Sequence, residues 1–257
     1  MPTRETAPTG GPCWVDLMTS DVDGARAFYS QLLGWESDEP NEEFGGYFNF
    51  TKDGVLVAGG MPSMGAGMPD VWSVYLATDD ARKTIEAVTA NGGQVIADAM
   101  DVHDLGTMAV VTDPSGAAIG MWQPGLHKGF GVLAQVGASS WWELMTRDYD
   151  SAVAFYTTVF GWSTQTMGDE SELRYTMAMD GDQPMAGVMD ASSFLPEGIP
   201  NHWSVYFGVE DTDAALAEVV ALGGSIRMPA EDTPYGRMAT VADPTGTQFK
   251  IVTQPAA

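Results

Sequence analysis

Alternating apolar and polar side chains predict a β-strand over residues 13–19. Cys13, Val15 and Leu17 form an apolar side of this strand, whereas Asp16 on the opposite side carries a charge. Asp21 or Ser20 is suited to cap an amphipathic helix expected over residues 22–33, and Gly34 is suited to a left-handed C-cap. The pattern therefore predicts a strand that is followed at once by a helix.

The same strand–helix pattern returns three times along the chain. Residues 14–35 (WVDLMTSDVDGARAFYSQLLGW) come back 127 positions later as residues 141–162 (WWELMTRDYDSAVAFYTTVFGW), and shorter versions lie at 71–93 and 202–224. Further strands are expected at 44–51, 55–61, 94–100, 107–112 and 118–123, and the second half closes with MATVADPTGTQFKIVTQP at 238–255. Such a long-period repeat predicts two domains, each with a β-α-β-β-β pattern written twice.

The repeat divides the chain into four parts and predicts the α+β class. These parts are a flexible tail at 1–12, a first domain at 13–124, a linker at 125–138 and a second domain at 139–255. Because the two halves are able to pair with each other, a monomer with an internal pseudo-dimer is expected, with a homodimer as the alternative.

Charge and composition limit the kinds of partner that the chain is expected to bind. The 257 residues include 11 basic and 35 acidic side chains, which gives a net charge of −24. Such a chain is repelled by phosphate backbones and by anionic membranes, so we expect it to bind neither nucleic acid nor membrane. There is no apolar run of about 20 residues and no apolar leader at the start, and the single cysteine, Cys13, excludes an internal disulfide. A cytoplasmic location is expected.

Two short motifs occur once in each half. The helical segments share Asp-x-x-x-Ala-x-x-Phe-Tyr-x-x-x-Leu/Phe-Gly-Trp, with the Phe-Tyr pairs at 28–29 and 155–156, and Asp-Pro-x-Gly turns lie at 113–116 and 243–246. In these motifs and in its paired βαβββ units the chain resembles the vicinal oxygen chelate (VOC) superfamily. That group includes glyoxalase I, bleomycin- and fosfomycin-resistance proteins and extradiol dioxygenases, and the chain is similar to its tandem-domain, actinobacterial glyoxalase-like members. The resemblance implies that each domain forms an eight-stranded cup.

The resemblance also implies where a metal would be held. Metal-using members place His or Gln in the first strand, seven residues before the capping Asp, a second ligand in the fifth strand and Glu in the eighth. The matching positions here are Trp14, Ser73 and Gly120 in the first domain and Trp141, Ser204 and Lys250 in the second, with Trp72 and Trp203 in place of the serines if the alignment shifts by one. None supplies an imidazole or a carboxylate, so we expect no metal, and no other cofactor motif is present.

Strand parity predicts the residues that line the two cups. They are Trp14, Asp16, Met18, Ser73, Tyr75, Gly120 and Trp122 in the first domain and Trp141, Glu143, Met145, His202, Ser204, Tyr206, Gln248 and Lys250 in the second. Aromatic walls with a few polar groups are typical of small-molecule pockets, although each tryptophan could instead simply fill space. The other two histidines, His103 and His127, fall in loop or linker stretches, where we expect them to be solvated.

These residues lead to three hypotheses for function. The first is a metal-independent protein, similar to bleomycin-resistance proteins, that binds a small, partly aromatic organic molecule through the cup walls. The second is a metal-independent enzyme of the isomerase, lyase or cyclase type, or one that tailors natural products, in which Glu143 is the acid or base with Lys250, Tyr206 or His202 as partner. The third, a metal-dependent glyoxalase or dioxygenase, conflicts with the ligand count. Because Lys250 stands where the superfamily's metal-binding Glu would stand, we predict that the second cup carries any chemistry.

Overall fold

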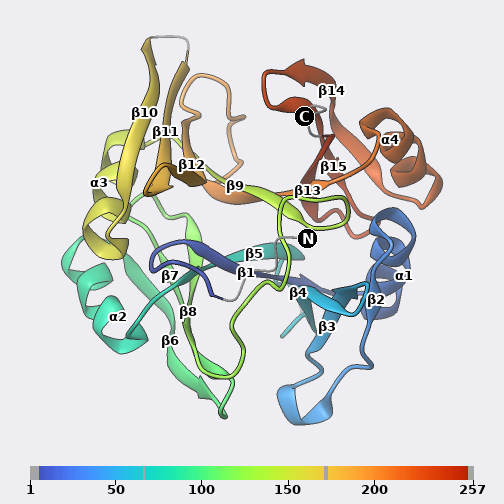
Figure 1. Ribbon diagram of the computed structural model, residues 1–257, viewed down its shortest axis with the longest axis horizontal. Helices are drawn as coiled ribbons and strands as arrows, with labels where there is room; N and C mark the ends of the chain where they lie inside the picture. Colours follow the sequence, from blue (N-terminus) through green and yellow to red (C-terminus); the bar gives the residue numbers. More distant parts are fainter. Residues whose placement is uncertain (1–5, 66, 171–172, 254–257) are drawn as a thin grey trace.

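The computed structural model describes residues 6–65, 67–170 and 173–253, and in these ranges it contains four α-helices and sixteen strands (Figure 1). The first half contains β1 (Pro12–Thr19), α1 (Val22–Leu33), β2 (Glu36–Ser37), β3 (Phe48–Lys52), β4 (Val55–Pro62), β5 (Val71–Ala77), α2 (Ala81–Ala90), β6 (Gln94–Val102), β7 (Gly106–Thr112) and β8 (Ala118–Pro124). The second half contains β9 (Ser139–Thr146), α3 (Tyr149–Phe160), β10 (Ser163–Glu170), β11 (Leu173–Asp180), β12 (Gln183–Asp190), β13 (His202–Gly208), α4 (Thr212–Ala221), β14 (Ser225–Thr233), β15 (Gly236–Ala242) and β16 (Gln248–Thr253). This order confirms the predicted α+β class and the doubled βαβββ pattern.

Each half forms its own eight-stranded mixed sheet. The strand orders are β2-β3-β4-β1-β5-β8-β7-β6 and β10-β11-β12-β9-β13-β16-β15-β14. In the middle of each sheet the first strands of the two units run antiparallel, β1 beside β5 and β9 beside β13. Residues on these central strands therefore meet across the pairing: Asp16 lies opposite Ser73, and Glu143 lies opposite Ser204.

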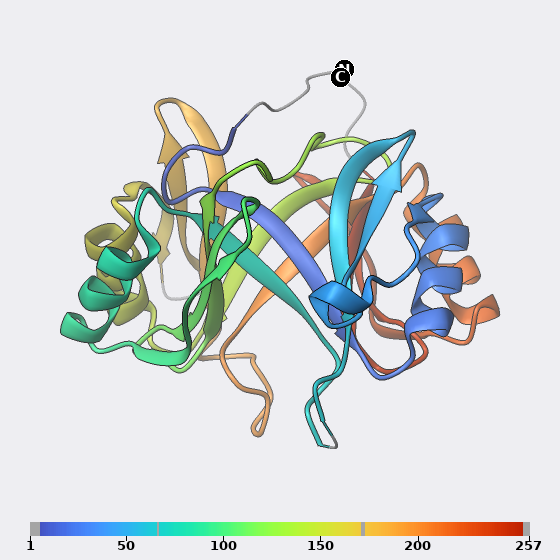
Figure 2. The same ribbon diagram turned by 90° about the horizontal axis from the view of Figure 1, so that it is seen from below.

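Aspartate caps start the helices as the sequence predicts. The carboxylates of Asp21, Asp80 and Asp211 each accept a hydrogen bond from a backbone N–H in the first turn, and Gly34 ends α1 with a φ of 66°. The four helices lie in two pairs at opposite ends of the molecule, with the strands between them (Figure 2). No helix among the described residues is long and apolar enough to cross a membrane.

The strand predicted around residues 44–51 is present, but its predicted start is wrong. The structure has a 3₁₀ helix at Glu42–Phe44, and strand β3 begins only at Phe48. The backbone of Gly45 and Gly46 adopts φ values of 65° and 85°, a left-handed conformation that a strand does not allow. The short strand β2 was not predicted, because two residues are too few to show alternation.

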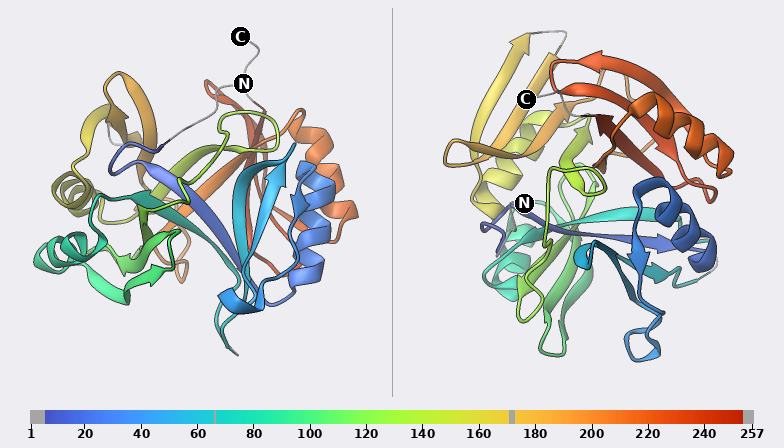
Figure 3. Two further views of the ribbon diagram at one scale, coloured as in Figure 1. Left: turned by 60° about the horizontal axis from the view of Figure 1, so that its bottom comes forward. Right: turned by 45° about the vertical axis from the view of Figure 1, so that its right-hand side comes forward.

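The two halves share one hydrophobic core. Helix α1 lies beside α4 and α2 beside α3, so each helix pair contains one helix from each half (Figure 3). The phenol of Tyr29 in α1 donates to Oδ2 of Asp243 at 3.1 Å, and the phenol of Tyr156 in α3 donates to Oδ2 of Asp113 at 3.3 Å. The Phe-Tyr motif of each half is therefore bonded to the Asp-Pro-x-Gly turn of the other half.

The segments that precede β1 and β9, the first strand of each half, also contact the opposite half. The indole of Trp35 donates to the carbonyl of Gly137 in the linker, and the indole of Trp162 donates to the carbonyl of Gly10, both at 2.7 Å. Gly10 and Gly137 stand 127 positions apart, which is the period of the repeat. Both tryptophans are buried, so each leading segment is fixed against the core of the opposite half.

Candidate functional site

The face of each sheet opposite its helices is here called a cup. The first cup carries Trp14, Asp16, Tyr75 and Trp122, and the second cup carries Trp141, Glu143, Ser204, Tyr206 and Lys250. The residues of alternate parity, among them Trp72 and Trp203, are buried, and each of these two indoles donates to the tyrosine of a helix, at 2.9 Å, in the shared core. The predicted division of strand residues between core and cup is confirmed at these positions.

Three polar groups meet in the second cup. Lys250 Nζ lies 3.0 Å from Glu143 Oε1 and 2.7 Å from the phenol oxygen of Tyr206, and that phenol donates to Glu143 Oε1 at 2.9 Å. The ammonium also lies 4.6 Å from the centre of the Tyr206 ring. The side chains of Lys250 and Glu143 are 15% and 7% exposed, so the ion pair is largely withdrawn from water and Lys250 is its more exposed member.

A second tyrosine, Tyr175, adjoins this cluster. Its phenol accepts a hydrogen bond from the indole of Trp141 at 2.9 Å and donates to the carboxylate of Glu143. Burial, followed by the negative charge of Glu143, raises the pKa of Tyr175, and the same two causes raise the pKa of Tyr206. Gly187 on the neighbouring strand leaves room for this phenol, because a Cβ there would lie 1.8 Å from its oxygen. Glu143 is therefore held by two neutral phenols and one ammonium.

His202 lies at the edge of the second cup. Its Nδ1 is 2.8 Å from the carbonyl oxygen of Pro200, and burial lowers the pKa of the imidazole, which favours a neutral ring beside Lys250. The guanidinium of Arg147 donates to the carbonyls of Leu195, Pro196 and Ile199, which fixes the loop that precedes His202. His202 thus borders the cluster without a direct hydrogen bond to it among the described residues.

The other two predicted residues of this cup differ in position. Ser204 is half-buried and lies opposite Glu143 in the strand register, so it belongs to the cup wall. Gln248 is exposed at the start of β16, two residues before Lys250, and no hydrogen bond joins its side chain to the cluster within the described residues. The structure therefore brings together Glu143, Lys250, Tyr206, Trp141 and Ser204, and leaves Gln248 outside the group.

The first cup holds a carboxyl group that has no cation beside it among the residues that the structure describes. Asp16 is 4% exposed, and burial raises its pKa from 3.8 to about 7, although hydrogen bonds from Tyr75 and Ser73 work in the opposite direction. The phenol of Tyr47 accepts a hydrogen bond from the indole of Trp14 at 2.8 Å, and its pKa is raised by burial and by Asp16. The carboxyl group of this cup is therefore mainly protonated, and neutral, only below about pH 7.

The linker fills the first cup. The ring of His127 packs edge-on against Trp14 with centroids 4.5 Å apart, and against Trp122 at 5.4 Å. Trp122 also donates its indole N–H to the carbonyl of His127 at 2.9 Å, and Phe130 lies 5.5 Å from Trp14. Burial lowers the pKa of His127 to about 4. The prediction of a solvated His127 is only partly right, because the linker passes over the cup and packs this half-buried ring against two indoles.

Gly120 explains why the two cups differ. It occupies the strand position in the first sheet that Lys250 occupies in the second. Gly120 pairs in register with Tyr75 on β5, as Lys250 pairs with Tyr206 on β13. A Cβ at position 120 would lie 2.2 Å from Cδ1 of Tyr75, so the phenol ring takes the space that a side chain would need. The first cup therefore has no room for a counterpart of the lysine.

The architecture is that of a known superfamily. A model of the Glyoxalase/Bleomycin resistance protein/Dioxygenase superfamily matches residues 12–121 and 138–251. The chain belongs to this superfamily.

Relatives of this glyoxalase-superfamily chain carry different names. "Putative glyoxylase CFP32" of Mycobacterium tuberculosis (strain CDC 1551 / Oshkosh) is 40% identical over 258 residues, which cover 98% of each chain. "Anthracycline biosynthesis protein DnrV" of Streptomyces peucetius is 36% identical over 258 residues, which cover 95% of this chain and 93% of that protein. The same sequence architecture therefore occurs under a glyoxylase name and under a biosynthetic name.

Solved structures share the fold at low identity. The 2,3-dioxygenase LapB from Pseudomonas sp. KL28 superposes with a TM-score of 0.66 at 14% identity, covering 97% of this chain and 96% of that one. The Mn(II)-bound glyoxalase from Novosphingobium aromaticivorans gives 0.63 at 16% identity, covering 95% and 82%. At these identities the likeness concerns the fold alone.

The positions that the superfamily uses for metal do not fit a metal here. In the second cup they hold an indole bonded to a phenol, a serine and the ammonium of Lys250, whose positive charge repels a cation. In the first cup they hold Trp14, Ser73 and Gly120, and the nearby carboxyl group of Asp16 is protonated up to about pH 7. Within the described ranges no three His, Cys, Asp or Glu side chains are grouped so that they could hold a metal ion. Divalent metals need deprotonated N, O or S ligands, which neither set provides.

Sequence reasoning missed two tyrosines of the cups. Tyr47 and Tyr175 contact the tryptophans of the first and second cup, but they come from other segments: Tyr47 directly precedes β3, and Tyr175 lies in β11. A signal was present: each tyrosine is paired with a glycine, Gly59 or Gly187, at equivalent places in the repeat, where a Cβ would collide with the phenol. Comparing the halves beyond their first strands would have identified both.

Proposed function

We propose that this protein binds a small organic molecule in its second cup without a metal, holding a carbonyl or anionic oxygen of the molecule on Lys250. The observation that supports the proposal is the position of Lys250, whose side chain is 15% exposed and whose ammonium is bonded to Tyr206 and Glu143 in a cup that also carries Trp141. A cationic donor beside a phenol is suited to an oxygen atom that carries partial or full negative charge. Trp141 and Tyr175 supply the flat wall for the rest of the molecule.

The first cup is already filled by side chains of the protein, which leaves one binding site per chain. Its centre is occupied by His127 and Tyr75, and its carboxyl group Asp16 has no cationic partner among the described residues. A ligand there would have to displace a ring packed between two indoles. We therefore expect one molecule to bind per chain, in the second cup.

The relatives suggest the class of ligand. One relative is named a putative glyoxylase and another an anthracycline biosynthesis protein, and anthracyclines are aromatic compounds with carbonyl groups. An aromatic hydroxyketone or quinone combines such an oxygen with a planar ring system, and the second cup pairs an oxygen-binding ammonium with aromatic walls. This class is our proposal for the ligand.

Proton transfer is the second candidate function. Glu143 accepts hydrogen bonds from Lys250 and Tyr206 on one oxygen, so the base and the oxygen-binding groups lie side by side. If Lys250 and Tyr206 turn to a substrate carbonyl, Glu143 could remove a proton from the adjacent carbon. The C–H bond would break, the electron pair would move to the carbonyl oxygen, and the resulting enolate would be stabilised by the ammonium.

Ligand binding tests the first candidate. The probe is 1,8-dihydroxyanthraquinone, added to protein that has been treated with EDTA, with quenching of tryptophan emission as the signal. We expect saturation at one equivalent and a loss of affinity of about tenfold or more in Lys250→Met, the scale of a lost charged hydrogen bond. The exposed Lys83 on α2 provides the matched control, and Lys83→Met should bind as the wild type does. Equal affinity in both variants would rule out the second cup as the site.

Exchange of hydrogen tests the second candidate. The hemithioacetal of methylglyoxal and glutathione is incubated in D₂O, and NMR records product formation and deuterium in the carbon next to the carbonyl. Catalysis that is abolished in Glu143→Gln, with the fold and anthraquinone binding retained, supports the enzyme. Stoichiometric binding with no turnover in the wild type supports the binding protein.

A further inference from the structure

One side-chain contact joins the two edges of the second sheet. Strands β10 and β14 stand at opposite ends of the strand order, yet the phenol of Tyr235, in the turn between β14 and β15, donates to Sδ of Met167 on β10 at 3.5 Å. The turn is held by the hydroxyl of Thr233, which accepts from the amide of Tyr235 at 3.1 Å and donates to the carbonyl of Gly236 at 2.8 Å. The contact between Tyr235 and Met167 is here called the edge bridge.

The edge bridge lies on the cup side of the sheet. Met167 is the register partner of Tyr175, and side chains that are paired across neighbouring strands point to the same face. Burial and the charge of Glu143 are the main causes that raise the pKa of Tyr175, and Tyr235 adds to them, so the two phenols are close to each other. Tyr175 adds in the same way to the raised pKa of Tyr206, after burial and Glu143. The edge bridge therefore borders the polar cluster of the second cup.

The hydrogen bond of the edge bridge is weak. A thioether sulfur is a poorer acceptor than a carbonyl oxygen, so the phenol gains when an oxygen atom replaces the sulfur. The Tyr235 side chain is on a residue that is 59% exposed, whereas the backbone of the turn is fixed by Thr233. The phenol can therefore change its acceptor by a turn of the side chain alone.

The first half bridges its sheet edges with other groups. His103, in the turn between β6 and β7, packs against Phe44 with ring centroids 5.2 Å apart, and its Nε2 lies 4.0 Å from Oε1 of Glu43. Phe44 and Glu43 belong to the 3₁₀ helix between β2 and β3, at the other edge of that sheet. The bridge with a phenolic donor therefore belongs to the half whose cup is not filled by the linker.

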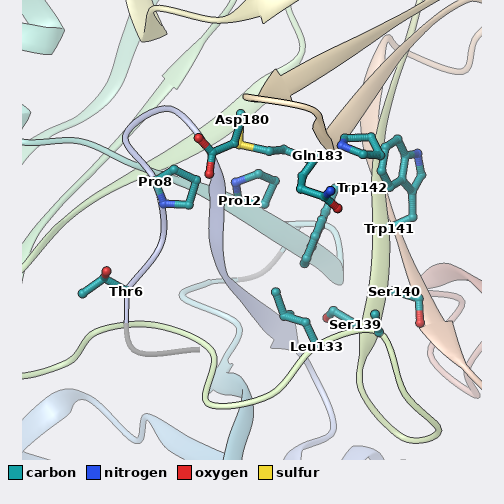
Figure 4. Close-up of a pocket in the computed structure, with 13 residues that line it drawn as sticks. Thr6, Pro8, Pro12, Leu133, Ser139, Ser140, Trp141, Trp142, Asp180 and Gln183 are labelled. Carbon is teal, nitrogen blue, oxygen red and sulfur yellow. The ribbon is translucent and has the colours of Figure 1, made fainter. Parts of the chain in front are cut away.

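A hollow beside Trp141 offers a way into the second cup. It has a volume of about 320 Å³ and is lined by Pro8, Leu133 and Trp141, among others, where the N-terminal segment and the linker pass the second sheet (Figure 4). Trp141 also belongs to the cup, where its indole N–H is bonded to Tyr175. The edge bridge is not part of the described lining of this hollow. A molecule can therefore reach the cup along Trp141 without passing the edge bridge.

We propose that Tyr235 is a second oxygen-binding residue of the second cup, so that the bound molecule carries two acceptor oxygens, one held by Lys250 and one by the phenol of Tyr235. This inference rests on the ligand binding proposed above and narrows the ligand class to aromatic compounds with two carbonyl groups, such as quinones. On binding, the phenol leaves the sulfur of Met167 and donates to the second oxygen. In the free protein the sulfur keeps the phenol in position.

Two probes that differ in one oxygen test this inference. The first is 1,8-dihydroxyanthraquinone, whose two carbonyls lie on opposite edges of its central ring. The second is 1,8-dihydroxyanthrone, which has a CH₂ group in place of one carbonyl; both are titrated without oxygen, with tryptophan quenching as the signal. Tyr235→Phe should weaken binding of the quinone by about fivefold, the scale of one neutral hydrogen bond, and leave binding of the anthrone unchanged. Lys250→Met should weaken binding of both probes by about tenfold or more.

Two further variants separate an exchange of acceptors from simple packing. Met167→Leu removes the competing sulfur and keeps the bulk of the side chain, so the quinone should bind up to about threefold more tightly, the scale of a weak hydrogen bond. His103→Leu changes the corresponding bridge of the first half, and it should bind both probes as the wild type does. The melting temperature of each variant shows that the fold is retained.

The outcomes distinguish this inference from the proposed function. Quinone binding that depends on Lys250 but is unchanged in Tyr235→Phe would overturn the inference and leave the proposed function standing. Equal losses for quinone and anthrone in Tyr235→Phe would also overturn it, because the ring would then act by packing alone. A loss in Tyr235→Phe confined to the quinone, with no effect of Lys250→Met, would support the inference and refute the role of the lysine. A wild-type protein that binds neither probe would overturn both.

Discussion

Replacing Asp16 with asparagine should stabilise the protein by an amount that grows with pH. Asparagine keeps the shape of a protonated carboxyl group and cannot ionise. The wild-type side chain is buried in the first cup, where its hydrogen-bond partners are the neutral hydroxyls of Tyr75 and Ser73, and no ammonium or guanidinium among the described residues lies beside it. Ionisation therefore costs free energy in the folded state that the unfolded chain does not pay.

The raised pKa of Asp16 gives the magnitude and the sign of the change in stability. Below about pH 4 the carboxyl group is protonated in both states, so its pKa shift has no effect on stability. Between pH 4 and 7 the unfolded chain releases this proton while the folded protein keeps it, so the wild type loses about 1.4 kcal/mol of stability per pH unit. The difference between a pKa of about 7 and the ordinary 3.8, at 1.36 kcal/mol per unit, amounts to about 4 kcal/mol above pH 7.

Urea unfolding, followed by tryptophan emission from pH 5 to 8.5, measures this difference. The lowered pKa of His127 makes stability rise with pH between about 4 and 6.5, but that contribution is common to both proteins and cancels in the comparison. Asp182→Asn, at an exposed turn, controls for the change in net charge. A gap between Asp16→Asn and wild type that is constant with pH, or that widens toward low pH, would refute the account of the first cup.

Three further predictions concern the second cup, the shared core and metal. Lys250→Met should lower the free energy of unfolding by about 3 kcal/mol, because Glu143 loses its ammonium partner. Combining Glu143→Gln with Lys250→Met should restore most of this free energy. Urea titration measures both variants, and a double variant as unstable as Lys250→Met would contradict the ion-pair explanation. Tyr29→Phe should cost about 1–3 kcal/mol because the phenol joins Asp243 to Trp72 in the core, and an unchanged melting temperature would show that this link is weak. Protein purified without chelator should contain well under one equivalent of zinc, iron, nickel or manganese by elemental analysis; a stoichiometric metal whose removal abolishes ligand binding would overturn the metal-free proposal.

The repeat made much of the fold predictable. Strand alternation placed Trp72 and Trp203 in the core, and aspartate and glycine caps located the helix ends, because these signals depend only on neighbouring residues. The pairing of Glu143 with Lys250 was predicted from the same parity. Local patterns therefore gave the sheets and the polar centre of the second cup.

The remaining features depend on contacts between distant parts of the chain. His127 looked like a linker residue because nothing near it in sequence shows that the linker passes over the first cup. Tyr29 and Asp243 are 214 residues apart, and no periodicity links a helix of one half to a turn of the other.

The shared core has a consequence for how such a chain acquires new specificities. The residues that the two halves have in common, such as Tyr29 and Tyr156, hold each half to the other, whereas those that differ, such as Gly120 and Lys250, lie in the cups. Neither half could be deleted, because each would leave the other's core uncovered. Either cup could nevertheless change its lining while the scaffold stays intact. Replacing His127 with a residue that has a smaller side chain would therefore be a natural first step toward opening a second binding site in the same molecule.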